Sequence, residues 1–236
     1  MKKNILVVDD SALMRRVICD IINSEGTFQA TDVCRDGLEA YDKITKNQYD
    51  AVILDVNMPR MDGLQLLERL QKEKIKATVI MVSTATIKDA DVTMLAMERG
   101  AIDFVTKPTN VIEAKGDQFK QRLLKVLTAV LKTARPAVGG TAVQSAGKIT
   151  LRQTKSSAKG GNKVVALACS TGGPKALQSV IPYLPKNLNA PMVLVQHMPE
   201  GFTKSMADRL NEVSPIHVKE AADGDVLEKG TVYIAP

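Results

Sequence analysis

Residues 51–63 read AVILDVNMPRMDG, and this stretch decides the fold of the first half of the chain. An apolar run from Ala51 to Leu54 is followed at once by Asp55 and then by a turn that contains proline. Four apolar residues without polar alternation are typical of a strand that is buried on both faces of a parallel sheet. Such sheets bind ligands beyond the carboxyl ends of their strands, which is where Asp55 falls.

The same pattern continues outward from this stretch in both directions. Short apolar runs alternate with longer amphipathic stretches up to residue 133. The successive runs and stretches cover residues 4–8, 12–23, 29–34, 38–45, 51–54, 64–72, 77–82, 89–99, 103–106 and 111–133. Five strand–helix pairs predict an α/β domain with a five-stranded parallel sheet and helices on both of its faces.

Three carboxylates follow the first and third predicted strands, namely Asp9, Asp10 and Asp55. Because the carboxyl ends of parallel strands share one edge of a sheet, we expect these side chains to lie together. Three adjacent carboxylates repel one another unless a cation lies among them, and an all-oxygen site with access to water suits Mg²⁺. The alternative is that each Asp is a separate, solvated loop residue.

The full pattern also has VST at 82–84 and TKP at 106–108, and it resembles the receiver domain of two-component response regulators. The resemblance implies that Asp55 accepts a phosphoryl group from a sensor histidine kinase. It also implies that Mg²⁺ is bound by Asp9, Asp10, Asp55 and Asn57. The residues that would contact the phosphoryl group are Ser83, Thr84 and Lys107. Of the two hydroxyl residues, strand register favours Ser83. Phe104 stands at the family's switch-aromatic position, with an ordinary core phenylalanine as the equal alternative.

A compositional change separates this domain from the rest of the chain. Residues 133–163 are rich in Gly, Ser, Thr, Ala and Lys and show no helical or strand period, which predicts a flexible linker between a receiver domain at 1–132 and a second unit at 164–236. Residues 111–163 carry 11 basic and 2 acidic side chains, more than enough to explain the net charge of +6. Because neither flanking unit is basic, we expect no nucleic-acid partner, and a DNA-binding output is disfavoured.

The second unit begins with a candidate nucleophile. Residues 163–174 read KVVALACSTGGP, which predicts a strand and then a tight turn that exposes Ser170. Ala168 departs from the first glycine of the G-x-S-x-G pattern, and phosphate binding by the glycine-rich turn is the alternative. The next predicted strand ends at His197, a candidate general base, although a purely structural histidine is the alternative. The other histidine, His217, falls in an alternating strand segment.

Four segments of this unit carry a second resemblance: ACSTGGP at 168–174, VQHMPEGFTKSMADRL at 195–210, VKEAADGD at 218–225 and VYIAP at 232–236. They resemble the catalytic α/β domain of the chemotaxis response regulator protein-glutamate methylesterases, and the order receiver, linker, STGG domain matches that family over the whole chain. The resemblance implies cofactor-free hydrolysis of glutamate γ-methyl esters, and deamidation of glutamines, on the cytoplasmic helices of methyl-accepting chemoreceptors. Ser170 would attack the carbonyl, His197 would carry the proton and the Thr171 N–H would hold the oxyanion.

The third residue of the family's catalytic triad is an acid that lies after a continuation of the sheet, whereas this chain stops at Pro236. The Asp residues after Ser170 are Asp208, Asp223 and Asp225, and their setting matches solvent-facing positions of the family. We therefore expect a member with an incomplete second domain that is phosphorylated but nearly inactive as an esterase. We also expect the unphosphorylated receiver to mask Ser170.

A function of a different class stays open, in which the chain is a phosphorylation-controlled binding module or a phosphate sink. Cys19, Cys34 and Cys169 lie in apolar segments without metal-ligand spacing, which is typical of reduced thiols. No apolar run reaches the roughly 20 residues that span a bilayer, and the N-terminus lacks the pattern of a secretory signal. We therefore expect a cytoplasmic protein without direct membrane insertion.

Overall fold

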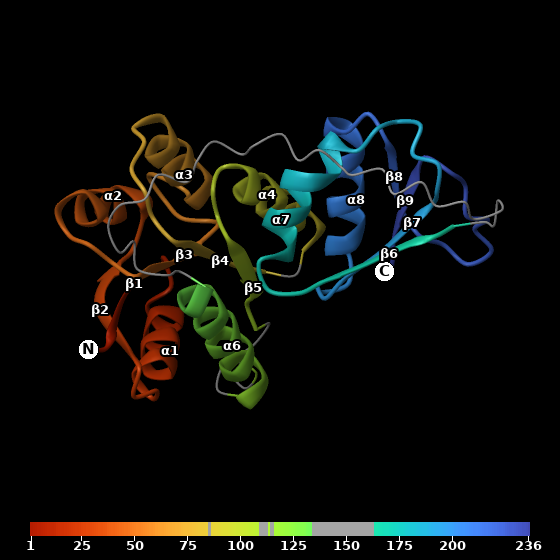
Figure 1. Cartoon of the computed structure of the whole chain (residues 1–236). Coiled ribbons are helices and arrows are strands. Elements are labelled where there is room, and N and C mark those ends of the chain that lie inside the picture. Colours follow the sequence, from red (N-terminus) through yellow and green to blue (C-terminus); the bar gives the residue numbers. More distant parts are fainter. Residues whose placement is uncertain (85, 109–112, 114–115, 134–162) are drawn as a thin grey trace.

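The computed structural model describes residues 1–84, 86–108, 113, 116–133 and 163–236. This part of the chain forms two parallel sheets with helices packed on them (Figure 1). The elements of the first half are β1 (Lys3–Val8), α1 (Ala12–Asn23), β2 (Phe28–Cys34), α2 (Gly37–Lys46), β3 (Ala51–Asp55), α3 (Gly63–Lys72), β4 (Val79–Ser83), α4 (Ile87–Glu98), β5 (Asp103–Thr106) and α6 (Asp117–Thr133). Those of the second half are β6 (Val165–Cys169), α7 (Gly173–Val180), the 3₁₀ turn η1 (Ile181–Tyr183), β7 (Met192–Gln196), α8 (Phe202–Val213), β8 (His217–Glu220) and β9 (Thr231–Ile234).

The first sheet has the strand order β2-β1-β3-β4-β5, and every neighbouring pair is parallel. The inner strands β3 and β4 are buried over their whole length, as their unbroken apolar sequence predicts. Helices α1 and α6 cover one face, and α2, α3 and α4 cover the other (Figure 1). The predicted five-stranded parallel α/β fold is therefore confirmed.

Short polar side chains begin the helices of this half. Ser11, Asp36, Asp62 and Thr86 each accept a hydrogen bond from a backbone N–H of the first turn of the helix that follows. These side chains satisfy donors that have no partner within a helix. They therefore determine where each loop at the carboxyl edge of the sheet ends.

The second sheet is also parallel, with the order β6-β7-β9-β8. Its apolar face packs on α7 and α8, where Leu177, Leu194 and Phe202 are buried. The register of β6 on β7 pairs Cys169 with Gln196. The two residues that follow, Ser170 and His197, therefore leave neighbouring strands at the same edge.

The two halves share an interface in which α7 and α8 lie between the second sheet and α4 (Figure 1). The ring of Phe104, from β5, stacks on that of Phe202 with centroids 4.8 Å apart. Two side chains of α7 donate to carbonyls of α4: Lys175 Nζ to Met97 O at 2.8 Å and Gln178 Nε2 to Met94 O at 3.0 Å. The interface is therefore partly apolar and partly hydrogen-bonded.

Some element boundaries differ from the predicted ones. The described helix α6 begins at Asp117, after Gly116, a poor helix former. The helical stretch was predicted from residue 111, and residues 111, 112, 114 and 115 lie outside the described residues. The strand predicted from Lys163 begins at Val165. The predicted linker at 133–163 falls almost entirely on residues 134–162, which lie outside the described residues.

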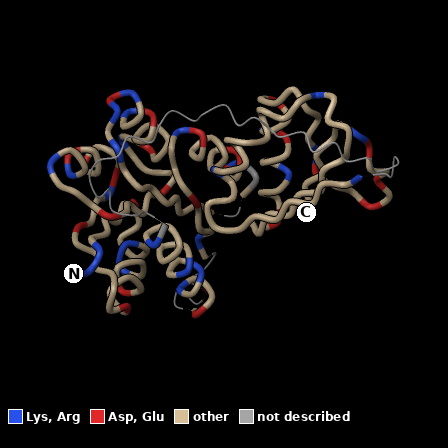
Figure 2. Tube along the Cα trace, in the orientation of Figure 1, with Lys and Arg blue, Asp and Glu red and all other residues tan. Residues whose placement is uncertain are grey.

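Charged side chains of both signs are intermixed along the described parts of both halves (Figure 2). The helix α6 is the longest described part of the basic middle segment and contributes Lys120, Arg122, Lys125 and Lys132. Within the described residues, no helix combines the length and apolar character needed to cross a membrane.

Candidate functional site

The three carboxylates predicted to meet do converge at the carboxyl edge of the first sheet. Asp9 follows β1 and Asp55 ends β3, and both are buried, with exposed fractions of 1% and 3%. Asp10 is exposed. One oxygen from each of the three lies within 4.8 Å of the others, close enough to bind a single cation.

Lys107 follows β5 and supplies a positive charge to the same cluster. Its Nζ lies 2.9 Å from Asp9 Oδ2 and 2.6 Å from Asp55 Oδ2. Burial disfavours the ammonium, but the two carboxylates outweigh this effect and raise the pKa of Lys107. Burial also raises the pKa of Asp55 to about 6, although Lys107 acts in the opposite direction. One ammonium thus does not fully compensate the buried carboxylates.

Mg²⁺ fits these residues by donor type and by an unused acceptor. Hard oxygen ligands are the ones that this ion prefers. Asp9 Oδ2 is buried and, apart from its ion pair with Lys107, accepts no hydrogen bond from the described residues. Asn57 lies in the loop after β3. Its side-chain amide donates to Asp89 Oδ1 at 2.9 Å, and this hydrogen bond does not involve the backbone carbonyl.

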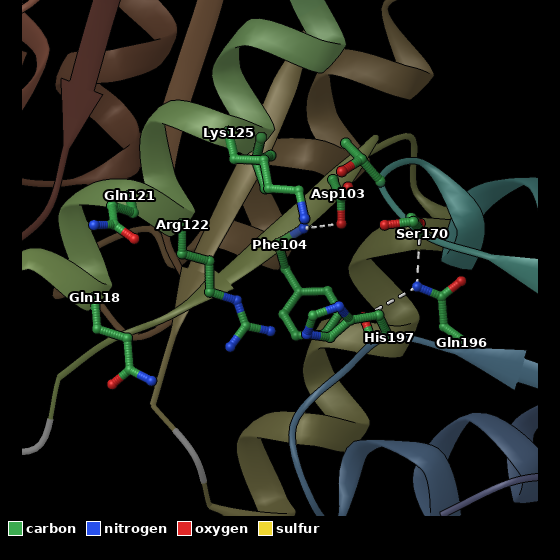
Figure 3. Close-up of a pocket in the computed structure, with 11 residues that line it drawn as sticks. Asp103, Phe104, Gln118, Gln121, Arg122, Lys125, Ser170, Gln196 and His197 are labelled. Atoms are coloured by element: carbon green, nitrogen blue, oxygen red, sulfur yellow. Dashed lines mark hydrogen bonds between the residues drawn. The ribbon is translucent and has the colours of Figure 1, made fainter.

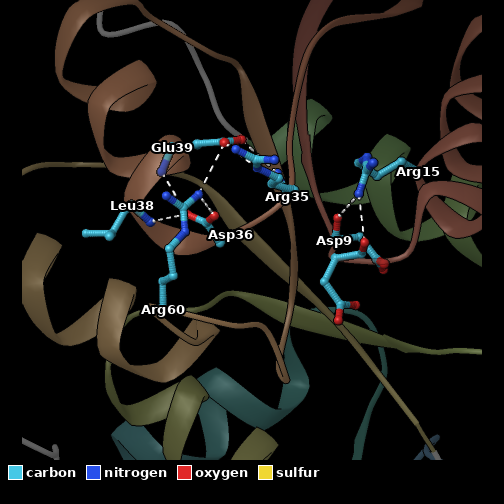
Figure 4. Close-up of polar contacts among 8 residues, drawn as sticks. Asp9, Arg15, Arg35, Asp36, Leu38, Glu39 and Arg60 are labelled. Carbon is cyan, nitrogen blue, oxygen red and sulfur yellow. Dashed lines mark hydrogen bonds and ion pairs between the residues drawn. The ribbon is translucent and has the colours of Figure 1, made fainter.

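Arg15 positions the first two carboxylates, and sequence reasoning missed it. From α1, its Nη1 donates to the carbonyl oxygens of Asp9 at 2.7 Å and Asp10 at 3.0 Å (Figure 4). The Asp9 side chain also accepts the Ser11 N–H at 2.9 Å. The available signal was an arginine one helical turn into the helix that follows the acidic pair.

A second set of charges holds the loop after β3. Arg60, which has a left-handed φ of 63°, forms ion pairs with the buried Asp36 and with Glu39 at 3.2 Å (Figure 4). Asp36 also begins α2 through the N–H groups of Leu38 and Glu39. This loop is therefore tied to the start of α2, a connection between distant segments that no spacing in the sequence indicates.

The two hydroxyl residues after β4 lie in different environments. Ser83 is fully buried, and its hydroxyl accepts a hydrogen bond from Thr93 Oγ1 at 3.0 Å. Thr84 is exposed, and its hydroxyl donates to the Asp89 carboxylate. The preference for Ser83 as the phosphoryl contact stays a prediction.

A second group of predicted residues meets in one pocket between the halves. Ser170, Thr171 and His197 line it from the second unit, and residues of β5 and α6 line it from the first (Figure 3). Ser170 and His197 are both exposed. Within the described residues, the Ser170 hydroxyl and the His197 ring form no hydrogen bond with each other, so the structure places the pair in one pocket without joining them directly.

The turn after β6 presents Ser170 at this pocket. The Ser170 carbonyl accepts the Gly173 N–H at 2.7 Å, which closes the turn. Gly172, at the N-cap of α7, has a φ of 75°, a left-handed conformation that glycine adopts without strain. The left-handed Gly172 lets the chain turn directly from the Ser170 segment into α7.

One of these N–H groups is occupied by the first unit. The carboxylate of Asp103, from β5, accepts the Gly172 N–H at 2.7 Å. Asp103 is 5% exposed, and burial raises its pKa despite this hydrogen bond. Sequence reasoning did not single out Asp103, although an acidic residue in a buried apolar strand was a signal. Phe104, beside it, is a buried interface residue.

The Asp residues considered as the third catalytic group lie elsewhere. Asp208 pairs with Lys204 on an exposed side of α8, and Asp225 pairs with Lys219. Asp223 is exposed in the turn between β8 and β9. In the part of the chain that the structure describes, no carboxylate forms a hydrogen bond with the ring of His197.

Comparison with known proteins gives two family matches. The family described as response regulator receiver domain matches residues 5–115, and the one described as CheB methylesterase matches residues 165–236. A protein-glutamate methylesterase/protein-glutamine glutaminase of Oceanobacillus iheyensis is 40% identical over 239 residues, covering 100% of this chain and 67% of its own length. The protein of the same description from Bacillus subtilis is 44% identical, covering 98% and 66%. The chain spans about two thirds of the length of these curated relatives.

Among solved structures, the response regulator domain of Thermotoga maritima CheB is similar to the first half. It is 35% identical, with a TM-score of 0.48, and the match covers 56% of this chain and 96% of that domain.

Proposed function

The chain belongs to the family of protein-glutamate methylesterases/protein-glutamine glutaminases, and from this premise we propose that it is a chemotaxis response regulator whose phosphorylation controls a serine hydrolase. The proposed reaction is the hydrolysis of glutamate γ-methyl esters, and the deamidation of glutamines, on the cytoplasmic helices of chemoreceptors. The observation that carries the proposal is the meeting of Ser170, Thr171 and His197 in a pocket that the receiver half borders.

In the receiver half, Asp55 is the proposed phosphate acceptor. Its carboxylate attacks the phosphorus of a phosphohistidine on a sensor kinase, and Lys107 compensates the charge on the phosphoryl oxygens. Asp9, Asp10, Asp55 and the Asn57 carbonyl are the proposed ligands of Mg²⁺, which when bound supplies the positive charge that lets an anion approach these carboxylates. The convergence of three carboxylates and Lys107 supports this assignment.

In the second half, Ser170 is the proposed nucleophile. Its hydroxyl oxygen attacks the ester carbonyl while His197 accepts the proton, and the Thr171 N–H donates to the developing oxyanion. His197 then returns the proton to the leaving methoxide, so that methanol departs and an acyl-enzyme remains. Water, deprotonated by His197, hydrolyses the acyl-enzyme and regenerates Ser170. No cofactor takes part in this step.

The interface supports control of the second half by the first. Asp103 holds a carboxylate on the Gly172 N–H, one residue from the Thr171 N–H that the oxyanion requires. A negative charge there disfavours a second one on the substrate. Because Ser170 is exposed, the proposed restraint acts by bordering the pocket and by occupying the Gly172 N–H, not by burying the nucleophile as complete masking would.

A second candidate function is a phosphorylation-controlled binding module or phosphate sink. The observation in its favour is that no described carboxylate orients His197, whereas a triad depends on such an acid for the correct tautomer. In this case the chain takes phosphate from its kinase but hydrolyses nothing.

The phosphorylation proposal is tested with acetyl phosphate as the donor. We expect the purified chain to take up phosphate in a Mg²⁺-dependent manner and the Asp55→Asn variant to take up none. Asp20→Asn, on the exposed side of α1, is the matched control and should label like the parent. Equal labelling of the Asp55→Asn variant would refute the assignment.

The hydrolase proposal is tested by methanol release from methylated chemoreceptor membranes. We expect release to increase on phosphorylation and to disappear in the Ser170→Ala variant. Ser179→Ala, an exposed serine of α7, is the control and should behave like the parent. A chain that takes up phosphate yet releases no methanol in either state favours the binding module.

A further inference from the structure

Gln196 is a buried polar residue that the catalytic scheme does not use. It is the last residue of β7, directly before His197, and its exposed fraction is 6%. Its side chain lies between the Ser170 segment and the His197 segment (Figure 3). A buried carboxamide is unfavourable unless its hydrogen bonds are made, so the partners of Gln196 indicate what it does.

Gln196 uses both of its donors on the two segments that carry Ser170 and His197. Its Nε2 donates to the Ser170 carbonyl at 3.1 Å and to the His197 carbonyl at 3.2 Å. The backbone bond between these segments, from His197 N to Cys169 O, is long at 3.4 Å. The carboxamide therefore joins the two chain segments at the point where the ladder of β6 and β7 ends.

The oxygen atom of the same carboxamide lies in an unfavourable environment. Gln196 Oε1 is buried and has no hydrogen-bond partner among the described residues. Leaving such an acceptor unsatisfied destabilises the fold, and an apolar side chain of the same length would avoid this. The two N–H groups are thus the feature that distinguishes glutamine from methionine at this position.

The turn is shaped around the same side chain. A Cβ on Gly173 would lie 1.9 Å from Gln196 Oε1 and 2.9 Å from Cys169 Cβ, so only glycine fits beside the carboxamide. Gly173 also donates its N–H to the Ser170 carbonyl, the acceptor that Gln196 uses. Gln196 and Gly173 therefore hold the Ser170 carbonyl from two directions.

We propose that Gln196 is a positioning residue, whose carboxamide fixes the backbone of Ser170 relative to that of His197 so that the hydroxyl and the imidazole can act on one substrate. This inference rests on the proposed hydrolase function for its effect on turnover. The part of it that concerns structure, namely that Gln196 joins the ends of β6 and β7, does not depend on catalytic activity. In this role Gln196, which also lines the pocket, acts through the backbone of Ser170 and His197.

Two variants test the role in turnover. Gln196→Met keeps the length but removes both donors, and we expect at least a tenfold loss of kcat with less than a twofold change of KM for methylated receptor. Gln196→Glu places a carboxylate against two carbonyls, and protonation restores one donor. The activity of Gln196→Glu, divided by that of the parent at the same pH, should therefore rise as the pH falls from 8 to 5. The same ratio for Gln196→Met should not change with pH.

Gln178 offers a matched control. It too donates from Nε2 to a carbonyl and has a buried, unpartnered Oε1, but its acceptor is Met94 O on α4. For the activity ratio, which the interface contact of Gln178 can alter, the control is Gln29→Glu, an exposed residue of β2, and its ratio should not change with pH. Thermal unfolding of each variant at each pH separates an altered site from a loss of fold.

A second measurement tests whether Gln196 joins the two strand ends, and it does not depend on catalytic activity. Hydrogen–deuterium exchange followed by mass spectrometry should show at least tenfold faster exchange at the Gly173 and His197 amides in Gln196→Met, with Gln178→Met like the parent there. If the parent chain releases no methanol, the proposed function fails while exchange still tests Gln196. Unchanged exchange at both amides, or a flat pH ratio for Gln196→Glu in an active chain, would overturn the proposal.

Discussion

At the scale of single residues, Asp55, the proposed phosphate acceptor, lies in an environment that is unfavourable for a carboxylate. Its carboxylate is buried beside Asp9, and burial raises its pKa to about 6, above the usual 3.8. The folded state therefore binds a proton between about pH 6 and pH 4 that the unfolded state binds only near pH 4. Acidification through this window removes the penalty of burying the Asp55 charge, and above pH 6 the whole of this penalty is present.

We predict that Asp55→Asn, in EDTA at pH 7.5, raises the free energy of unfolding by on the order of 2 kcal/mol, because it removes one buried charge. The difference from the parent should shrink as the pH falls from 6 to 4. Urea unfolding across this pH range measures it, with Asp20→Asn as the exposed control. A stability difference that is independent of pH would contradict the charge argument.

At the scale of elements, the start of α3 limits the geometry of the loop after β3. Gly63 is buried and donates its N–H to the Val56 carbonyl at 2.9 Å. A Cβ on Gly63 would lie 2.2 Å from the backbone carbonyl oxygen of Asp55. Alanine forms helices better than glycine by about 1 kcal/mol, but a contact this short with backbone requires the strand end or the helix to move.

We predict that Gly63→Ala lowers the free energy of unfolding by about 1–3 kcal/mol, so that the clash outweighs the helix propensity. It should also slow phosphate uptake from acetyl phosphate, since Asp55 must shift. Gly26→Ala is the control, because nothing lies within 4 Å of its Cβ position. Chemical denaturation and labelling of both variants decide the point, and equal stability of the two would argue against a tight contact.

At the scale of the whole molecule, an ion pair connects the receiver to the second unit. Arg209 on α8 contacts Glu98 on α4 through two hydrogen bonds, from Nε at 2.5 Å and from Nη2 at 2.8 Å. Both side chains are partly buried, with exposed fractions of 31% and 20%. Two-point contacts of this kind are stronger and more directional than single ones.

We predict that Arg209→Ala weakens the interface by about 1 kcal/mol, without altering the helix, since arginine and alanine both favour it. Hydrogen exchange in α4 and α8 should rise, and methanol release without phosphorylation should increase several-fold under the proposed function. Lys204→Ala is the control, because it removes an exposed pair with Asp208 on the same helix. Identical exchange in the two variants would show that the ion pair does not hold the interface.

The sequence was sufficient for the sheet and for the residues at its edge. A strand buried on both faces leaves an unbroken apolar run, so the sequence predicted that Asp9, Asp55 and Lys107 meet at the carboxyl ends of β1, β3 and β5. The structure brings these side chains together there. The family membership was predicted from the same strand-end motifs. Arg15 and Arg60 were missed because the position of an arginine in the sequence does not indicate which residues its side chain contacts.

What the sequence by itself determined is therefore the order of strands and helices, because periodicity reports local burial, and with it the family and the residue types at each strand end. Only the tertiary structure decided which surfaces meet. Asp103 reaches the Gly172 N–H from 69 residues away, and Gln196 joins the Ser170 segment across 26 residues. Such contacts depend on how helices and strands pack after they have formed. A pattern of polar and apolar residues along the chain does not indicate which distant residues this packing brings together.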